Sequence, residues 1–260
     1  MVSKVKYLFY TVLLICTYIG ISQTQGPTTA RYKSAYPNCV KDVTSTKVIM
    51  ESGISFVFGA KNNTTDFEEW LDNATLYDQL EQVYKKGTPA SHPPMFYDPG
   101  RARHEKFFEE LYGRSSAEVK KNCTIVKWID GSPLFVTTKN GVDKHLRSIV
   151  SELTLLPKSF RKYLNKPGGT FNWRNIAGTN RRSTHSYGIA IDINVAQSHY
   201  WRSSTPTKDG FYPYKNSIPM EIVNIFERHG FIWGGKWYHY DTMHFEYRPE
   251  LCTKDCNCDE

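Results

Sequence analysis

The segment STHSYGIAID, residues 183–192, places one histidine and one aspartate seven positions apart, with a glycine and an alanine between them. From residue 187 to residue 195, apolar residues alternate with small or polar ones, which is typical of a strand with one buried face. The two faces would carry Ile189, Ile191, Ile193 and Val195 on one side and Ala190, Asp192 and Asn194 on the other. Because Gly188 permits a bend before the strand, His185 and Asp192 can come close enough to bind one ion.

A second alternating segment, residues 244–247, supplies a third candidate ligand. Phe245 and Tyr247 face one side of this expected strand, and His244 and Glu246 face the other. A catalytic zinc ion takes three protein ligands and keeps a fourth position open for water. The sequence therefore predicts one zinc ion bound by His185, Asp192 and His244.

Hydrolysis at such a site also needs a base and a cation for the negative charge that develops on the carbonyl oxygen. Asp241, three residues before His244, could accept a proton from a zinc-bound water without being a ligand itself. Arg174, within GTFNWRN at residues 169–175, is the first candidate for the cation, and Arg181 and Arg182 are the alternatives. Together these residues are the minimum for hydrolysing a peptide bond.

Each of these residues also has an ordinary structural interpretation. The chain has 8 histidines, so His244 could be a core histidine, and Asp192 could cap a turn. The HExxH pattern of many zinc proteases does not occur in the sequence. The histidines without ligand partners in the pattern are expected to be surface or structural residues: His199, His229 and His239.

Outside these two segments the sequence predicts mainly helices, over residues 65–86, 101–112, 115–121, 141–155 and 217–230. Shorter features are a polar lead-in at residues 23–34, a hairpin over residues 124–138 and an extended stretch at residues 171–173. Helices mixed with antiparallel strands predict an α+β fold with a small antiparallel sheet. We expect a single domain, with an N-terminal elaboration over residues 23–150, a core over 151–249 and a cysteine-rich tail over 250–260.

The first 22 residues have the pattern of a secretory signal peptide. Lys4 and Lys6 precede an apolar run over residues 7–21, and Ser22 offers a cleavage site. We therefore expect a secreted protein without stable membrane association after cleavage. In an oxidising compartment the remaining cysteines are disulfide candidates, with one left over, namely Cys39, Cys123, Cys252, Cys256 and Cys258.

Glycosylation and charge are less specific signals. Sequons occur at Asn62, Asn63, Asn73 and Asn122, and they are acceptors only in a glycosylating secretory pathway. The net charge of +7 favours anionic polymers in general. The basic residues are dispersed and form no nucleic-acid recognition pattern, so we expect no nucleic-acid partner. We expect the protein to be a monomer.

Two blocks of sequence carry a resemblance to a known family. The first is SxHxxGxAxD at residues 183–192, and the second is WGGKW…D..HFE at residues 233–246. In this order they resemble the VanY-type D-alanyl-D-alanine carboxypeptidases and the related L-alanyl-D-glutamate endolysins, over about residues 169–247. The resemblance implies zinc on His185, Asp192 and His244, and Asp241 as the base. It also implies the compact α+β fold that these peptidases share with the Hedgehog signalling domain.

One departure from the family pattern concerns the arginine. The usual Gly-Tyr-Arg before the site is here Phe-Asn-Trp-Arg, which weakens the transfer of its role to Arg174. Upstream, YDPGRAR at residues 97–103 and NGVDKHLRSIVSEL at residues 140–153 resemble elements of longer exported members. We assign no chemistry to these two upstream segments.

The resulting hypothesis is a secreted zinc peptidase that hydrolyses the D-amino-acid-containing stem peptides of bacterial peptidoglycan. The alternative is a non-enzymatic zinc module of Hedgehog-like fold that binds a cell-surface or cell-wall ligand. A zinc-independent, lectin-like wall binder would fit the aromatic residues and the basic charge, but it leaves the two motif blocks unexplained. A carboxypeptidase and an L-alanyl-D-glutamate endopeptidase would share these residues, so the sequence does not determine which bond is cut.

Overall fold

The computed structural model describes residues 26–87 and 93–252. The expected signal peptide, residues 1–22, lies outside these ranges, as do Cys256 and Cys258.

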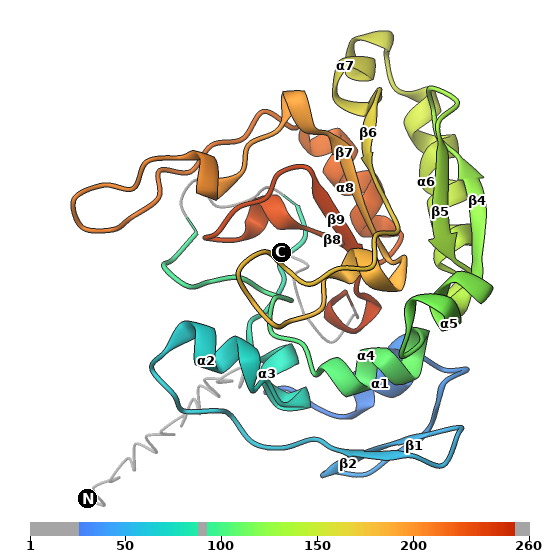
Figure 1. The fold of residues 1–260 in the computed structure, drawn as a ribbon, viewed down its shortest axis with the longest axis vertical. Helices are drawn as coiled ribbons and strands as arrows, with labels where there is room; N and C mark the ends of the chain where they lie inside the picture. Colours follow the sequence, from blue (N-terminus) through green and yellow to red (C-terminus); the bar gives the residue numbers. More distant parts are fainter. Residues whose placement is uncertain (1–25, 88–92, 253–260) are drawn as a thin grey trace, which may run out of the picture.

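A four-stranded antiparallel sheet carries both segments singled out in the sequence (Figure 1). Its strands are, in spatial order, β6 Pro167–Gly169, β7 Ala190–Asn194, β9 His244–Tyr247 and β8 Phe231–Trp233. In the register of β7 and β9, Asp192 lies directly opposite His244, and Ala190 lies opposite Glu246. Cross-strand neighbours of this kind share one face of a sheet, so the pairing brings two candidate ligands together.

The opposite face of this sheet is buried against helices. Helix α8 (Met220–Arg228) lies against β8, and helix α6 (Val142–Leu155) lies between α8 and the hairpin (Figure 1). The Phe226 ring of α8 stacks on Phe245 of β9, with ring centroids 4.0 Å apart. The isoleucines that alternate through residues 189–193 are fully buried, and burying each such side chain stabilises the fold by about 1.5–3 kcal/mol.

Several expected elements are confirmed. The hairpin consists of β4 (Cys123–Lys127) and β5 (Pro133–Thr137), paired in antiparallel register. Helix α5 (Ser116–Lys121) begins at Ser115, whose hydroxyl accepts a hydrogen bond from the backbone N–H of Glu118. Serine is a favoured N-cap for this reason, so the start of this helix could be predicted from the sequence.

The prediction of a single helix over residues 65–86 is wrong. Two short helices take its place, α2 (Phe67–Asp72) and α3 (Leu76–Glu81). Thr75 and Asp78 form a reciprocal cap in which each side chain accepts a hydrogen bond from the backbone N–H of the other residue. This cap starts a new helix at residue 76, and Val83, which was expected on the same apolar stripe, lies beyond its end with 40% of its surface exposed.

Three further differences concern short elements. Part of the expected polar lead-in belongs to helix α1 (Ala30–Ala35), and the helix expected over residues 101–112 starts later, as α4 (Glu105–Tyr112) capped by His104. Residues 171–173 form no strand. A three-stranded antiparallel sheet was not expected at all, and it consists of β1 Val40–Val43, β2 Lys47–Met50 and β3 Ser55–Val57. These strands have only three or four residues each, so the alternation that reveals a strand is too short to stand out in the sequence.

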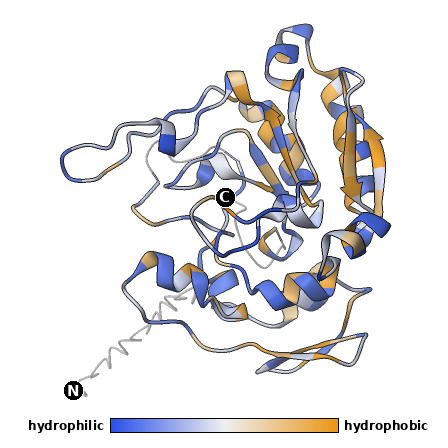
Figure 2. Cartoon of the chain, in the orientation of Figure 1, coloured by the Kyte–Doolittle hydropathy of each residue, from blue (hydrophilic) through white to orange (hydrophobic). Residues whose placement is uncertain are grey.

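The N-terminal elements share a hydrophobic core with the four-stranded sheet. Tyr32, Tyr36 and Phe107 belong to the same cluster of buried side chains as Ile191 and Phe245. Figure 2 shows apolar residues on the strands and helices around this core and hydrophilic residues along the connecting loops. The α+β class with an N-terminal elaboration is confirmed, whereas the boundaries at residues 150 and 249 stay predictions.

Within residues 26–87 and 93–252, no helix combines the length and the apolar character needed to cross a bilayer. No disulfide joins Cys39, Cys123 and Cys252 to one another, and the Cys39 thiol donates a hydrogen bond to Oδ1 of Asn140 at 3.2 Å. Pairings that involve Cys256 or Cys258 stay predictions. Glycosylation also stays a prediction, and two of the sequon asparagines, Asn63 and Asn73, are exposed.

Candidate metal centre

Three side-chain atoms from distant parts of the sequence converge on one point. His185 Nε2 lies 3.3 Å from His244 Nδ1 and 3.3 Å from Asp192 Oδ1, and His244 Nδ1 lies 3.1 Å from Asp192 Oδ1. In a tetrahedral zinc site with bonds of about 2.0–2.1 Å, two ligand atoms are roughly 3.3 Å apart. The spacing of these three atoms therefore fits one zinc ion, and they form a possible metal-binding group.

The other nitrogen of each imidazole ring is already bonded. His185 Nδ1 lies 2.6 Å from the carbonyl oxygen of Thr170, and His244 Nε2 lies 3.0 Å from Oε2 of Glu246. Both acceptors lack a proton to give, so each ring donates an N–H outward, and the inward nitrogen can bind a metal ion when it carries no proton. Ligand histidines are oriented in this way in metal sites, and Glu246 holds His244 as its partner.

Local backbone structure explains how His185 reaches this point. Residues Thr184–Tyr187 form a single 3-10 turn that Gly188 ends in the left-handed conformation, with φ of +66°. A Cβ atom at residue 188 would lie 3.0 Å from the backbone nitrogen of Thr137. Both the positive φ and the close approach to β5 favour glycine, so the turn can place His185 beside the first residues of β7.

The pKa values of Asp192 and His244 depend strongly on each other's charge. Burial by itself would raise the pKa of Asp192, but the charges and hydrogen bonds of His185 and His244 outweigh it and hold that pKa well below its usual range. Burial by itself would lower the pKa of His244, but Asp192 and Glu246 outweigh it and raise the pKa to about 10. The site is thus built to hold positive charge.

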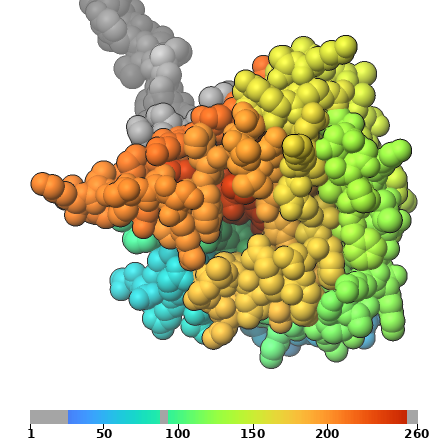
Figure 3. Space-filling model, turned by 45° about the horizontal axis from the view of Figure 1, so that its top comes forward, coloured from blue at the N-terminus to red at the C-terminus, as the bar shows by residue number. Residues whose placement is uncertain are grey.

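A cavity of about 550 Å³ opens over the three ligands. It is also lined by Asp241, Glu246 and Trp237, and by arginines from two separate segments of the chain. Figure 3 shows the hollowed face of the molecule, where red residues of the C-terminal strands lie between the orange and the yellow segments. The convergence point can therefore be reached by a molecule from solution.

Asp241 lies in the wall of this cavity without a hydrogen bond to one of its carboxylate oxygens. Within the described part of the chain, its buried Oδ1 has no hydrogen-bond partner. Burial raises the pKa of Asp241, the positive charges of His244 and Arg101 oppose the rise, and the charge of Asp192 adds to it, so that the pKa is about 6. A buried carboxylate that is free to accept a proton suits a general base.

The glycine pair of the second motif fixes the position of Asp241. The backbone N–H of Asp241 donates to the carbonyl oxygen of Gly234 at 3.0 Å. A Cβ atom at residue 234 would lie 2.6 Å from the Asp241 carbonyl oxygen, and one at residue 235 would lie 2.1 Å from the Trp233 ring. The Gly-Gly turn is therefore a steric requirement of the wall that holds Asp241.

The arginine candidates from the sequence have different surroundings. Arg174 lines the cavity with an exposed side chain that donates to the carbonyl oxygen of Asn175 at 3.3 Å. Arg181 also lines the cavity but pairs with Glu68 and Asp72 of α2. The Arg182 guanidinium lies over the Trp173 ring, 4.5 Å from its centroid.

Sequence reasoning missed two further arginines in the cavity wall, Arg101 and Arg103. Arg101 lies over the Trp237 ring, 5.4 Å from its centroid, and its charge acts on Asp241. Both arginines belong to the YDPGRAR segment, whose resemblance to longer exported members was the only signal in the sequence that pointed to it.

The remaining histidines have structural contacts. His239 is buried and pairs with Asp98 at 2.7 Å, and His229 pairs with Glu152 at 2.5 Å. His199 Nε2 lies 2.8 Å from the Ser217 hydroxyl, at the rim of the cavity.

Comparison with known proteins places the centre in a family. Residues 177–247 match the family model for peptidases of the M15 type described as D-alanyl-D-alanine carboxypeptidase. The match includes His185, Asp192, Asp241 and His244 and excludes Arg174, and it confirms the resemblance seen in the two motif blocks. This region of the chain is thus similar to the D-alanyl-D-alanine carboxypeptidase family. No curated protein and no solved structure matches the chain significantly.

Proposed function

We propose that the protein is a secreted zinc peptidase that hydrolyses D-amino-acid-containing stem peptides of bacterial peptidoglycan. The family match supports the substrate class, and the spacing and orientation of the three ligand atoms support zinc. One observation carries the case for catalysis over binding alone. Asp241 lines the same cavity as the ligands, and its buried Oδ1 has no partner among the described residues; a purely structural metal site has no use for such a group.

Each residue has a defined task in this proposal. Bound zinc would lower the pKa of a water molecule and polarise the scissile carbonyl. Asp241 takes a proton from the attacking water and gives it to the leaving amine nitrogen, so that the products are a carboxylic acid and an amine. Glu246 fixes the ring of His244, and the Thr170 carbonyl fixes the ring of His185.

The cation that stabilises the oxyanion is assigned to an arginine of the cavity wall. Arg174 is the first candidate because its side chain is exposed at the cavity and pairs with no carboxylate in the described residues. Arg101 is the second candidate because its charge already acts on Asp241. Replacing each by glutamine separates them, since the residue that contacts the oxyanion should lower kcat and leave zinc content unchanged.

The decisive experiment is mass spectrometry of purified peptidoglycan after incubation with the zinc-loaded protein, with and without a zinc chelator. Loss of terminal D-alanine that the chelator abolishes would show a carboxypeptidase. Release of stem peptides from the glycan side would show an endopeptidase. If protein that carries zinc changes nothing, the function is wrong and the Hedgehog-like binding module takes its place.

Secretion is part of the proposal and rests on residues 1–22 alone. N-terminal sequencing of protein expressed through a secretory pathway should give a chain that starts at Gln23. An intact N-terminus on exported protein would instead show an uncleaved anchor.

A further inference from the structure

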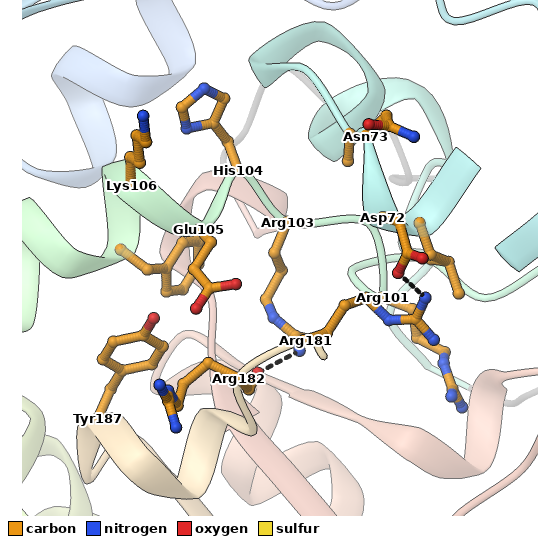
Figure 4. A pocket seen from close by; sticks show the side chains of 13 residues that line it. Asp72, Asn73, Arg101, Arg103, His104, Glu105, Lys106, Arg181, Arg182 and Tyr187 are labelled. Carbon is orange, nitrogen blue, oxygen red and sulfur yellow. Dashed lines mark hydrogen bonds and ion pairs between the residues drawn. The ribbon is translucent and has the colours of Figure 1, made fainter. Parts of the chain in front are cut away.

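A second cavity, of about 300 Å³, adjoins the metal cleft. Its walls come from α2, from the segment that leads into α4, and from the loop before the turn of His185 (Figure 4). Leu71, Arg101, Arg103 and Arg181 line both cavities, so the two lie side by side. We call this second cavity the arginine pocket.

Positive charge in the arginine pocket exceeds negative charge. Five lysine and arginine side chains line it, against the two carboxylates of Asp72 and Glu105. The carboxylate of Asp72 forms an ion pair with Arg181. Within the described residues no ion pair neutralises Arg101, Arg103 or Arg182, and Glu105 pairs with none of the arginines.

Arg103 illustrates this imbalance. Its guanidinium donates to the carbonyl oxygen of Arg182 at 3.0 Å, which is a neutral partner. Burial lowers the pKa of Arg103 from its ordinary value, and the charge of Glu246 only partly opposes the shift. A negative group placed beside Arg103 would stabilise its charge.

A buried hydroxyl without a partner also lies in this wall. Tyr187 has 1% of its surface exposed, it lines the arginine pocket, and its hydroxyl has no hydrogen-bond partner within the described residues. An unsatisfied buried hydroxyl is costly, and an acceptor supplied by a ligand removes that cost.

We propose that the arginine pocket binds a carboxylate of the peptide whose backbone lies across the metal centre. The proposal rests on the proposed peptidase function, because the same substrate must reach both cavities. Planar guanidinium groups match a carboxylate in shape and charge, and the Tyr187 hydroxyl supplies a neutral donor. The pocket then selects peptides by an acidic group that is separate from the bond to be cut.

The test uses a stem pentapeptide in which the side-chain carboxylate of D-glutamate and the C-terminal carboxylate are amidated one at a time. Binding is measured by calorimetry on the zinc-loaded full chain that carries Asp241→Asn, so that bound peptide is not consumed. One of the two amidations should weaken binding by about tenfold to a hundredfold, as expected for a charge-assisted hydrogen bond. Equal affinity for all three peptides overturns the proposal, and so does the absence of binding.

Two substitutions locate the effect in the pocket. Arg182→Gln removes a guanidinium that makes no ion pair, and Tyr187→Phe removes only the unpartnered hydroxyl. Arg182→Gln should abolish most of the discrimination between free and amidated peptide, and Tyr187→Phe should reduce it about fivefold without lowering the unfolding temperature of the peptide-free protein. Discrimination that persists in both variants overturns the proposal.

Arg202→Gln is the matched control. Its guanidinium lies over the Trp201 ring at 5.2 Å, much as Arg182 lies over Trp173, but it lines neither of the two cavities. It should leave the discrimination unchanged. If it has the same effect as Arg182→Gln, the preference comes from general surface charge and the pocket assignment is wrong.

Two further measurements separate this proposal from its alternatives. Wild-type protein that discriminates between the peptides but cleaves none would keep the pocket and overturn the peptidase function. Wild-type protein that cleaves all three peptides with equal kcat/KM would keep the function and overturn the pocket. Inorganic phosphate that binds in an Arg182-dependent way, while amidation has no effect, would show a site for a free anion and overturn the peptide assignment.

Discussion

The described residues include two buried histidine–carboxylate clusters that differ in kind, and of these two, one has the properties of a metal centre. At the first cluster, both oxygens of Asp98 accept hydrogen bonds from His239, one from the ring and one from the backbone N–H. At the second, the inward atoms of His185, Asp192 and His244 face one another at 3.1–3.3 Å, and all three can bind a metal ion once His244 has lost its proton. Burial and a close histidine–carboxylate contact are therefore poor markers of a metal site. The convergence of three potential ligand atoms on one point is a better one.

The largest expected effect falls on the base. Asp241→Asn keeps the shape and removes the negative charge, so kcat should fall by about 10²- to 10⁴-fold while zinc content stays unchanged. Stopped assays with a stem peptide, together with metal analysis of the same sample, provide the measurement. Asp98→Asn is the isosteric control, and it should leave kcat nearly unchanged in the fraction that is folded. Turnover that survives Asp241→Asn would remove this residue from the mechanism.

The next effect concerns the orientation of His244. Glu246→Gln exchanges the carboxylate that accepts from His244 Nε2 and should weaken zinc binding by about 10- to 100-fold. Competition with a chromophoric chelator measures the affinity. Glu250→Gln is the control, because Glu250 also pairs with Arg248 but does not contact His244, so its effect on zinc binding should be smaller. If both variants weaken zinc binding equally, the effect is a general loss of structure.

A smaller effect should distinguish the two clusters, because a change at Asp98 should alter the stability of the fold and leave zinc binding unchanged. Asp98→Asn weakens two hydrogen bonds to His239 and should lower the free energy of unfolding by about 1.5–3 kcal/mol. Zinc affinity should change by less than about twofold, because no ligand atom is involved. Denaturant unfolding and chelator competition on one preparation test both expectations. A marked loss of zinc would break the distinction between the clusters.

The smallest expected effect is the number of protons that the protein releases when it binds zinc. The pKa of His244 is raised to about 10, so at pH 7 this histidine is protonated before zinc binds and must be neutral as a ligand. Zinc binding at pH 7 should therefore release about one proton, and the release should disappear as the pH rises through the raised pKa. Calorimetry in buffers of different ionisation enthalpy counts the proton. Uptake of a proton, or none released, would contradict the ligand role of His244.

The core of the site could be predicted from the sequence because it depends on local rules. Alternation with a period of two places Asp192 and His244 on the faces opposite to the buried Ile191 and Phe245, and the antiparallel register then sets them side by side. The glycine at residue 188 likewise signals the bend before the strand. The alternation and the bend are local inferences, whereas the pairing of β7 with β9 is a contact between distant segments that the structure supplies.

The rest of the cavity wall depends on long-range packing. Arg101 and Arg103 reach the metal cleft because the N-terminal segment folds against the sheet, and apart from the resemblance of their segment to longer exported members, the sequence contains no sign of that placement. The break between α2 and α3 was missed for another reason: a reciprocal cap at Thr75 and Asp78 overrides a helical periodicity that continues through it. The role of Glu246 was left open in the sequence because its contact with His244 is visible only once the side chains are placed.

A continuous line of hydrogen bonds joins the metal centre to the start of the fold. It runs from His244 to Glu246, on to Arg248 and Glu250, and ends at Tyr36 of the N-terminal region. Binding at one end of such a line is linked thermodynamically to order at the other end. Zinc should therefore protect the N-terminal region from proteases, and a fragment that starts at residue 151 should bind zinc poorly. The elaboration and the peptidase core would then behave as one cooperative unit rather than as a catalytic domain with an optional extension.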